Sequence, residues 1–390
     1  MRLLLLVFVT IALSSLNGFS QLRIKGNIRM SDNWESRIYI LRLDRVDIAP
    51  PVLIDSFDIG KNGEFEYSFK NYSPQGLLYK LVLPPTGKGY NTVIDGYAEN
   101  HFFVSTEEEA NLEINAASDS LHYSIEIKGG IINRDLLQFR DLKIPYYKFS
   151  KMAEDSIRAN PDNLPEVRRA LMPVAMEIIE NSRKELKEVL SKPGSMSATL
   201  LGVYYLYQLE FGNPNKETVL KKLAEVKNDD ILLVKNTRNL IENKKGVVGT
   251  TLPNFPLQDT NGRQVNLYDV KGYLVIDFWA SWCGPCRYAN KHELPQLQET
   301  LNKNGLSLVA ISIDDDLSKW KSAVKSDKTG WNQYLDQSRV MSKFLQLEAV
   351  PQYLIVDDEK KIVFEANSSF FVENFLKENK LIKTTPGKQQ

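Results

Sequence analysis

The sequence predicts a multidomain protein with a β-rich N-terminal sandwich or open barrel, a helical middle segment and a C-terminal α/β fold. Three observations support this class. The length of 390 residues exceeds that of one ordinary domain. Strand-like alternation of polar and apolar residues extends to about residue 130, where a helical period replaces it. From about residue 247, apolar strand-like runs alternate with amphipathic segments, as in α/β folds.

The composition limits the classes of partner. Lys and Arg together number 49, as do Asp and Glu, so the net charge is zero. Because there is no basic excess, we expect neither nucleic acid nor an anionic membrane as the main partner. A hydrophobic content of 43% is sufficient for ordinary packed cores.

Residues 1–20 are typical of a signal peptide. Met1 and Arg2 precede a mostly apolar run over residues 3–13, and small or polar residues follow it, with cleavage expected before Gln21. The alternative is a membrane anchor, but the run is shorter than the roughly 20 residues that a membrane span needs. No cysteine lies near the cleavage region, which argues against a lipid-modified N-terminus. We therefore expect an exported protein, in a bacterial periplasm.

Residues 21–130 are predicted to form the β-rich domain. Ile24 and Ile28 alternate with charged or polar residues, and short strand-like runs with turn residues between them continue along the segment. Asn62-Gly63 is typical of a hairpin turn, and the aromatic residues that follow alternate, which places them on one face of a strand. The pattern predicts a small sandwich or open barrel of unknown function.

Residues 131–246 are predicted to be helical, after a boundary at Gly129-Gly130. A long amphipathic stretch covers residues 166–190, with a kink or an early break expected at Pro173. Three further helices are expected, at residues 196–211, 216–227 and 230–243.

Residues 247–382 are predicted to form the α/β domain, and residues 383–390 a disordered tail. After a leading hairpin around Asn261-Gly262, the expected strands are 273–280, 306–313, 352–356 and 362–365, and the expected helices are 285–302, 317–326, 338–345 and 371–379.

Cys283 and Cys286 are the only cysteines in the chain. They follow the apolar run 273–280, at the place where a helix should begin. Free backbone N–H groups and the helix dipole stabilise a thiolate at such a position. Two residues separate the cysteines, so the pair can close a small ring and open it again. The spacing indicates reversible dithiol–disulfide chemistry.

Residues 275–286 resemble the active-site segment of the thioredoxin superfamily. The preceding segment, residues 251–272, resembles the exported TlpA/ResA-like thiol–disulfide oxidoreductases. The resemblance covers residues 247–380 and implies a thioredoxin-like fold without a bound cofactor. The β-rich head and the helical segment resemble those of Bacteroidetes exported proteins, in which a domain of unknown function precedes the thioredoxin module.

The two cysteines have different expected roles. Cys283, at the exposed start of the helix, should attack a substrate disulfide, and the more buried Cys286 should resolve the mixed disulfide. Gly284-Pro285 lets the chain turn and starts the helix. The resemblance associates this dipeptide with reductases, so we expect reduction of disulfides in exported proteins.

Asp277 is the third candidate catalytic residue. A carboxyl group in an apolar strand is costly unless it has a function or a partner. The resemblance implies that Asp277 moves the proton of Cys286, and burial should raise its pKa toward neutrality. The alternative is an Asp at the strand edge that bonds to a nearby backbone group.

Val350, Pro351 and Trp282 are the candidate substrate-binding residues. A proline directly before an apolar strand is an edge or cis-turn signal. The resemblance implies that Pro351 is cis and faces the dithiol, so that backbone groups of Val350 pair with an extended substrate. Trp282 and Trp279 should flank the site, with ordinary packing as the alternative, and Trp282 is the better surface candidate because it adjoins Cys283.

The sequence departs from the family pattern after the dithiol. The family often carries Glu three residues after the second cysteine, where this chain has Ala289. Glu293 comes one helical turn later, and either replaces that glutamate or is a solvated charge. Ala310 stands near the place of the thioredoxin lysine, so Asp277 is expected to lack a charged partner. His292 is expected at the surface.

Three other functions compete with disulfide reduction. Metal binding through the two thiolates is disfavoured, because a structural zinc site needs about four ligands and no second cysteine pair exists. A peroxiredoxin would place a lone attacking cysteine after a Pro and Thr pattern, which is absent. In the third alternative, residues 21–246 bind a partner or form a homo-oligomer, and the redox module is accessory.

The expected partners follow from export and from the dithiol. They are disulfide-containing exported proteins, apocytochrome c being one candidate from cytochrome c biogenesis, and a membrane electron donor that carries electrons from the cytoplasm.

Overall fold

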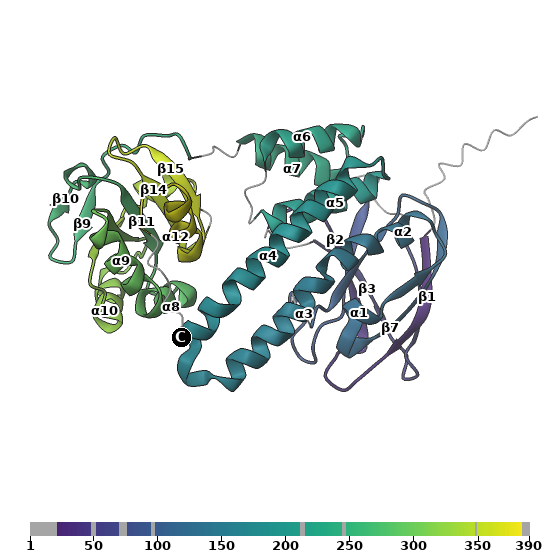
Figure 1. Cartoon of the computed structure of the whole chain (residues 1–390). Coiled ribbons are helices and arrows are strands. Elements are labelled where there is room, and N and C mark those ends of the chain that lie inside the picture. Colours follow the sequence, from purple (N-terminus) through teal and green to yellow (C-terminus); the bar gives the residue numbers. More distant parts are fainter. Residues whose placement is uncertain are drawn as a thin grey trace, which may run out of the picture. The chain divides into compact units, whose positions relative to one another are not determined.

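The computed structural model describes residues 22–47, 52–69, 76–94, 98–210, 215–243, 247–347 and 349–383 (Figure 1). The chain divides into two compact units, the first made of Met1–Arg158 with Val174–Glu242 and the second of Ala159–Pro173 with Asn243–Gln390. The expected signal peptide lies outside the described residues, as does the tail from residue 384. Across the described ranges, every helix is too short or too polar to span a bilayer.

The first unit contains two four-stranded sheets, in the orders β4-β1-β7-β8 and β3-β2-β5-β6. The strands are β1 (Leu22–Arg29), β2 (Arg37–Arg42), β3 (Val52–Asp58), β4 (Glu64–Ser68), β5 (Leu78–Val82), β6 (His101–Ser105), β7 (Ala110–Ala117) and β8 (Glu126–Lys128). Alternate residues of both sheets, among them Ile24 of β1 and Ile40 of β2, enter one hydrophobic core. The period of two along each strand produces this core, because successive side chains point to opposite faces.

The turn at Asn62-Gly63 forms, but the hairpin prediction was wrong in its pairing. Gly63 has a φ of 84° and its N–H bonds to the Gly60 carbonyl. The strands on either side pair elsewhere, since β3 pairs with β2 and β4 with β1. A local turn signal fixes a change of chain direction, whereas the burial of each strand's apolar face selects its neighbour.

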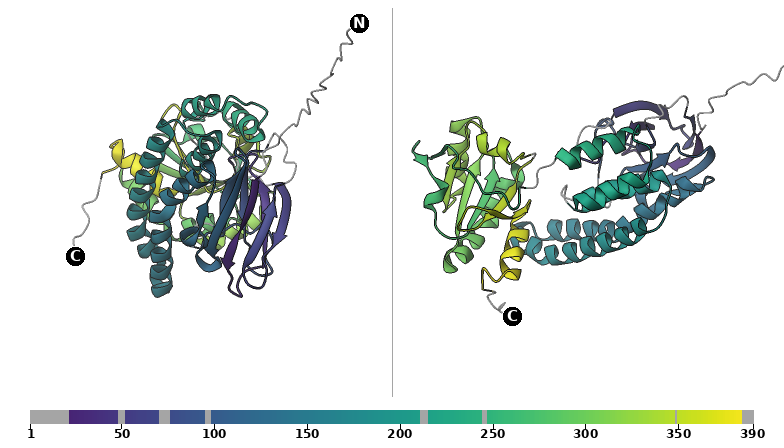
Figure 2. Two further views of the ribbon diagram at one scale, coloured as in Figure 1. Left: turned by 90° about the vertical axis from the view of Figure 1, so that its right-hand side faces the viewer. Right: turned by 90° about the horizontal axis from the view of Figure 1, so that it is seen from above.

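The helices that follow begin with α1 and include two long members. They are α1 (Leu121–Ser124), α2 (Ile132–Asp135), α3 (Leu137–Ala159), α4 (Leu164–Ser191), α5 (Met196–Leu209), α6 (Lys216–Glu225) and α7 (Leu232–Asn243). Helices α3 and α4 lie side by side in Figure 2, and Ser182 donates a hydrogen bond to the Leu142 carbonyl at 3.3 Å. Helix α4 continues through Pro173, so the early break considered from the sequence does not occur.

A second core joins these helices to the sheet of β5 and β6. Leu78 of β5 and Phe103 of β6 belong to this core together with Leu200 and Leu206 of α5. Tyr79, the next residue of β5, points into the core between the sheets. Strand β5 therefore has one face toward each core, which places Lys80 on the helical side, in line with Leu78.

The second unit is built on a seven-stranded sheet in the order β10-β9-β13-β12-β11-β14-β15. Its strands are β9 (Leu257–Asp259), β10 (Gln264–Val265), β11 (Leu274–Trp279), β12 (Ser307–Ser312), β13 (Asn332–Leu335), β14 (Gln352–Val356) and β15 (Ile362–Ala366). Strand β11 is parallel to β12 and antiparallel to β14. All its residues are buried, as expected for a central strand covered on both faces.

Five helices accompany this sheet, and polar caps begin several of them. They are α8 (Gly284–His292), α9 (Leu294–Lys303), α10 (Leu317–Asp327), α11 (Val340–Phe344) and α12 (Ser369–Glu378). Asp316 caps α10 through the N–H groups of Ser318 and Lys319. The described residues of this unit's hydrophobic core lie between Val247 and Ile382.

Candidate active site

Strand β11 leads to the dithiol, which lies at the start of α8. The strand ends at Trp279, and the chain then crosses to Gly284, where α8 begins. Cys283 is the N-cap residue of α8, and Pro285 lies in the first turn. The proline has no N–H to leave unsatisfied and its fixed φ suits a first helical turn, so the local sequence favours this helix start.

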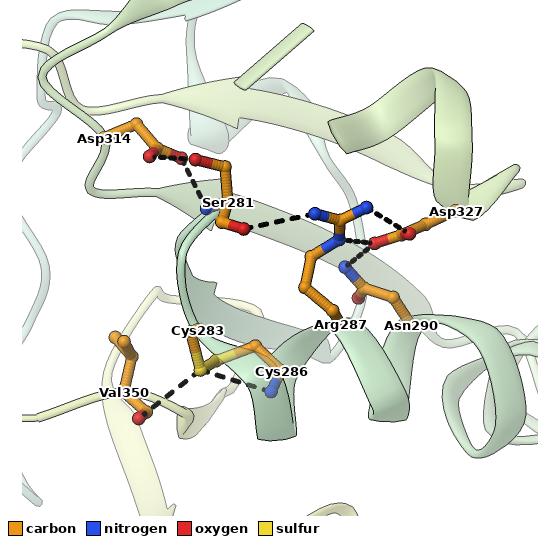
Figure 3. The surroundings of a disulfide bond; sticks show 8 residues. All are labelled: Ser281, Cys283, Cys286, Arg287, Asn290, Asp314, Asp327 and Val350. Carbon is orange, nitrogen blue, oxygen red and sulfur yellow. Dashed lines mark hydrogen bonds and ion pairs between the residues drawn. A yellow bond between two sulfur atoms is a disulfide. The ribbon is translucent and has the colours of Figure 1, made fainter. Parts of the chain in front are cut away.

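Cys283 and Cys286 form a disulfide bond, with their Cα atoms 5.3 Å apart (Figure 3). The Cys286 backbone N–H donates a hydrogen bond to Cys283 Sγ at 3.1 Å. The Val350 carbonyl oxygen lies 3.6 Å from the same sulfur. When the bond is reduced, the N–H group and the helix dipole stabilise negative charge on Cys283, so this sulfur is the easier of the two to ionise.

The expected exposure of Cys283 was wrong for this disulfide form. Cys283 is 4% exposed and Cys286 is 1% exposed, so both are buried. The sulfur of Cys283 is occupied by its bond to Cys286 and faces the Val350 carbonyl, which leaves little surface for water. Trp282, the residue before Cys283, is 65% exposed, whereas Trp279 is fully buried in the core. Packing is therefore the role of Trp279, and Trp282 is the aromatic group open to solvent.

The Val350–Pro351 peptide bond is cis, as the family resemblance implied. It directly precedes β14, the antiparallel neighbour of β11. This topology brings Val350 to Cys283, although the two residues lie far apart in the sequence (Figure 3).

Asp277 lies in the middle of β11 and is buried. Its neighbours in register are Ala310 of β12 and Tyr353 of β14, neither of which is cationic. In the part of the chain that is described, neither carboxyl oxygen has a hydrogen-bond partner. Desolvation therefore raises the pKa of Asp277 to about 8. The alternative of a backbone-bonded Asp was wrong, because neither carboxyl oxygen accepts a hydrogen bond within the described residues.

Two polar networks around the dithiol were not foreseen from the sequence. In the first, the buried Asp314 accepts hydrogen bonds from the Ser281 N–H at 2.8 Å and from the Ser281 and Ser312 hydroxyls, each at 2.7 Å. Ser281 and Asp314 come soon after the ends of parallel strands β11 and β12. The sequence signal for this network was thus two polar residues at the carboxyl ends of neighbouring strands.

The second network holds the first turns of α8 (Figure 3). Arg287 is ion-paired with Asp327 of α10 and donates a further hydrogen bond to the Ser281 carbonyl at 3.1 Å. Lys291 also pairs with Asp327, at 3.2 Å. Burial by itself would raise the pKa of Asp327, but the bonds from Arg287 and Lys291 outweigh it and lower the pKa. Arg287 therefore connects the residue before the dithiol loop to a buried anion.

Glu293 is partly buried, and the bond that its side chain accepts comes from Ser369 rather than from a residue of the dithiol. It ends α8 and accepts a hydrogen bond from Ser369 at 2.6 Å. His292 is exposed and packs against the ring of Tyr288, with the ring centroids 4.7 Å apart. Within the described ranges, no three His, Cys, Asp or Glu residues are grouped so as to hold a metal ion.

Residues 248–365 match the AhpC/TSA family, and this part of the chain is a thioredoxin-like domain. The thiol-disulfide oxidoreductase ResA of Bacillus subtilis is 29% identical over 119 residues, which are 30% of this chain and 64% of that protein. The ResA protein of Bacillus thuringiensis is 27% identical over 147 residues, which are 37% of this chain and 82% of that protein. The match thus spans somewhat less than two thirds of the first relative.

The chain is also similar to a solved structure, the thioredoxin domain of a thiol-disulfide oxidoreductase from Bacteroides vulgatus. The identity is 29% and the TM-score 0.31, with 35% of this chain and 99% of that one covered. The family match over residues 248–365 includes the Cys283–Cys286 pair.

Proposed function

Since residues 248–365 form a thioredoxin-like domain with a bonded Cys-x-x-Cys pair, we propose that this protein is an exported thiol–disulfide oxidoreductase that reduces protein disulfides. The observation that carries the proposal is the hydrogen bond from the Cys286 N–H to Cys283 Sγ at the start of α8. This donor favours a thiolate on the sulfur that must attack. The ResA relatives, which are named thiol-disulfide oxidoreductases, support the same chemistry.

The reaction begins from the reduced dithiol. The Cys283 thiolate attacks one sulfur of a substrate disulfide, a mixed disulfide forms, and one substrate thiolate leaves. The Cys286 thiolate then attacks the Cys283 sulfur. This closes the internal disulfide and releases the second substrate thiolate. The substrate gains two electrons and its thiolates take up protons, while the enzyme ends in the oxidised form found here.

We assign to Asp277 the role of accepting the proton of the Cys286 thiol. A carboxylate that is buried and unpartnered in the described residues, with a pKa of about 8, accepts a proton from a thiol far more readily than an ordinary Asp. Its deprotonated form activates Cys286 for the second step. Loss of Asp277 should therefore slow resolution of the mixed disulfide more than its formation.

We assign substrate binding to Val350, Pro351 and Trp282. The Val350 carbonyl already faces the reactive sulfur, so an extended substrate segment that pairs with this backbone would place its disulfide beside Cys283. Trp282, the residue before Cys283, presents an exposed aromatic ring. Such a surface accepts many polypeptides, because backbone pairing does not depend on the substrate's side chains.

Export and the direction of the reaction belong to this proposal as well. The N-terminal pattern of residues 1–20 supports secretion to a periplasm. A reductase in an oxidising compartment needs a continuous supply of electrons, which we assign to a membrane donor that re-reduces the Cys283–Cys286 bond. Exported proteins with disulfides, apocytochrome c among them, are the expected substrates.

Trapping in cells tests the proposal. Cys286→Ala removes the resolving thiol, so substrates should accumulate on Cys283 as covalent complexes that a reductant releases and that mass spectrometry identifies. The matched control is the double variant Cys283→Ala/Cys286→Ala, which should capture nothing. If Cys283 reacts with a small alkylating probe but no exported protein is captured, the protein-disulfide substrate is excluded.

A further inference from the structure

A cavity of about 400 Å³ lies inside the first unit, in the size range of small-molecule sites. Strand β5 and helices α3, α4 and α5 contribute to its wall. The lining is mainly apolar and includes Phe139, Leu142, Ile178, Ile179, Leu186 and Leu209. Leu142, Ile178 and Ile179 remain only half-buried, so apolar side chains there have surface that the unit's own packing does not cover.

Lys80 places a positive charge in this apolar wall. The alternation of β5 directs Lys80 to the helical side, where its Nζ donates a hydrogen bond to the Tyr204 hydroxyl at 3.0 Å. The same Nζ lies 5.3 Å from the ring centre of Phe103 and 5.2 Å from that of Tyr204. In the described parts of the chain, no carboxylate pairs with Lys80. Its contacts are a neutral hydroxyl and two aromatic rings, which hold the ammonium without neutralising it.

The other charges around the cavity are already balanced. Lys143 also lines the cavity and is ion-paired with Glu99, whose side chain is 4% exposed. His101 lies near the same carboxylate, with its Nε2 at 3.8 Å from Glu99. The Glu99 carboxylate is thus shared by Lys143 and His101. Among the described lining residues, Lys80 is the positive charge without a carboxylate partner. An apolar cavity with one unneutralised cation is complementary to an apolar molecule that carries one negative group.

We propose that this cavity binds a small amphipathic carboxylate. The Lys80 ammonium and the Tyr204 hydroxyl bind the carboxylate, and the apolar side chains of α3 and α4 enclose the rest of the molecule. A neutral amphiphile of the same length would leave Lys80 without an anion, and a cationic one would be repelled. This site lies in the first unit, so it does not depend on the proposed redox function of the second.

Fluorescence titration of the purified mature chain tests the site. The probe is 11-(dansylamino)undecanoic acid, kept below the concentration at which it forms micelles. We expect saturable binding, displaced by dodecanoate and much less well by dodecanol or dodecyltrimethylammonium. Equal displacement by all three, or no saturable binding, would overturn the proposal.

Two substitutions assign the binding to this cavity. Lys80→Met keeps the apolar stem and removes the charge, and it should weaken binding of the probe about tenfold, as expected for one charged hydrogen bond. The matched control Lys25→Met, at an exposed position of β1, should leave the affinity unchanged. Leu142→Trp should fill the cavity and abolish binding, with circular dichroism to verify folding. Unchanged affinity in Lys80→Met contradicts the proposal, even if Leu142→Trp does not fold.

Discussion

At the scale of the residue, the site depends on two groups that water does not stabilise. Cys283 has an N–H donor and a helix terminus to favour its thiolate. Asp277 has no hydrogen-bond partner in the described residues and is held in the sheet core. The surroundings of Cys283 favour its ionised form, whereas burial disfavours the ionised form of Asp277. Burial raises the pKa of Asp277 to about 8, so this carboxyl group can exchange a proton with a thiol near neutrality.

Asp277→Asn should change the pH dependence of stability. The pKa of Asp277 is raised to about 8 by burial, from an ordinary 3.8. Between these values the folded state keeps a proton that the unfolded state has lost, so stability falls as the pH rises. We expect the variant to be more stable than the wild type by on the order of 2–5 kcal/mol at pH 9, with a small difference at pH 4. Urea unfolding of the oxidised proteins measures this.

The same substitution should remove a kinetic step. Resolution of a mixed disulfide on Cys283 should accelerate through about pH 8 in the wild type, as Asp277 ionises. In Asp277→Asn this rise should be absent, while alkylation of Cys283 keeps its own pH profile. Asp358→Asn, at an exposed position, is the control. A wild-type profile in Asp277→Asn would show that another group takes the proton.

At the scale of the element, α8 is positioned by more than its own hydrogen bonds. Arg287 bonds to Asp327 of α10 and to the Ser281 carbonyl, so one side chain links two helices and the loop before Cys283. Asp314 fixes the other side of Ser281. The loop before the dithiol is therefore held by Asp314 directly and by Asp327 through Arg287.

Asp327→Asn should weaken this attachment. The variant removes a buried anion and leaves Arg287 without its counter-charge, which costs about 2–4 kcal/mol. The pKa of Asp327 is lowered, so its contribution is present above the unfolded value of 3.8 and is lost as the pH falls through the lower folded value. Unfolding measured from pH 7 to pH 3 should show the two proteins converging at acid pH. A constant difference over that range would argue against the ion pair.

Gly26→Ala should destabilise the β-rich part of the first unit. Gly26 of β1 lies opposite Ile114 of β7, and a Cβ on it would lie 1.7 Å from the Ile114 carbonyl oxygen. Because that atom belongs to the backbone, the strands must separate, at a cost of about 3 kcal/mol or more. Gly194→Ala, whose Cβ would meet nothing closer than 3.5 Å, is the control and should be nearly neutral. Thermal unfolding compares the two, and similar melting temperatures would refute the close approach.

At the scale of the whole molecule, the two units have separate hydrophobic cores. The core of the second unit uses residues from Val247 to Ile382, and the two cores of the first use residues from Leu22 to Ile241. Among the described residues, each unit thus has hydrophobic core residues of its own. This arrangement is compatible with the alternative considered from the sequence, in which residues 21–246 bind a partner or form a homo-oligomer.

Deletion of residues 22–245 tests that division. The fragment keeps the hydrophobic core of the second unit, so it should fold and reduce the disulfides of insulin with dithiothreitol as electron donor at a rate similar to that of the full chain. The set of proteins trapped by its Cys286→Ala variant should become less selective. A folded fragment without activity would show that the deleted residues take part in the chemistry, and an unchanged trapped set would remove them from substrate selection.

The local chemistry of the dithiol could be read directly from the sequence. Cys283 and Cys286 follow an apolar strand at a helix start, and Asp277 interrupts that strand, so their residue types and spacing predict the disulfide and a perturbed acid. Most strands and helices of residues 247–382 follow from the same short-range periodicity. Strand β13 (Asn332–Leu335) was not predicted, and the helix expected at residues 285–302 is divided into α8 and α9. The predicted features depend on residues that are close together in the sequence, so the sequence alone is enough to predict them.

The contacts around the dithiol are set by the tertiary structure, although the family resemblance already implied that Pro351 faces the dithiol. The antiparallel placement of β14 beside β11 brings Val350 to Cys283, and α10 brings Asp327 to Arg287. The pairing of β3 and β4 with different sheets, and the surplus charge of Lys80 in an apolar cavity, likewise depend on which segments share a core. The physical reason is that burial and ion pairing are set by distances in space between distant segments, whereas periodicity and capping act within a few residues.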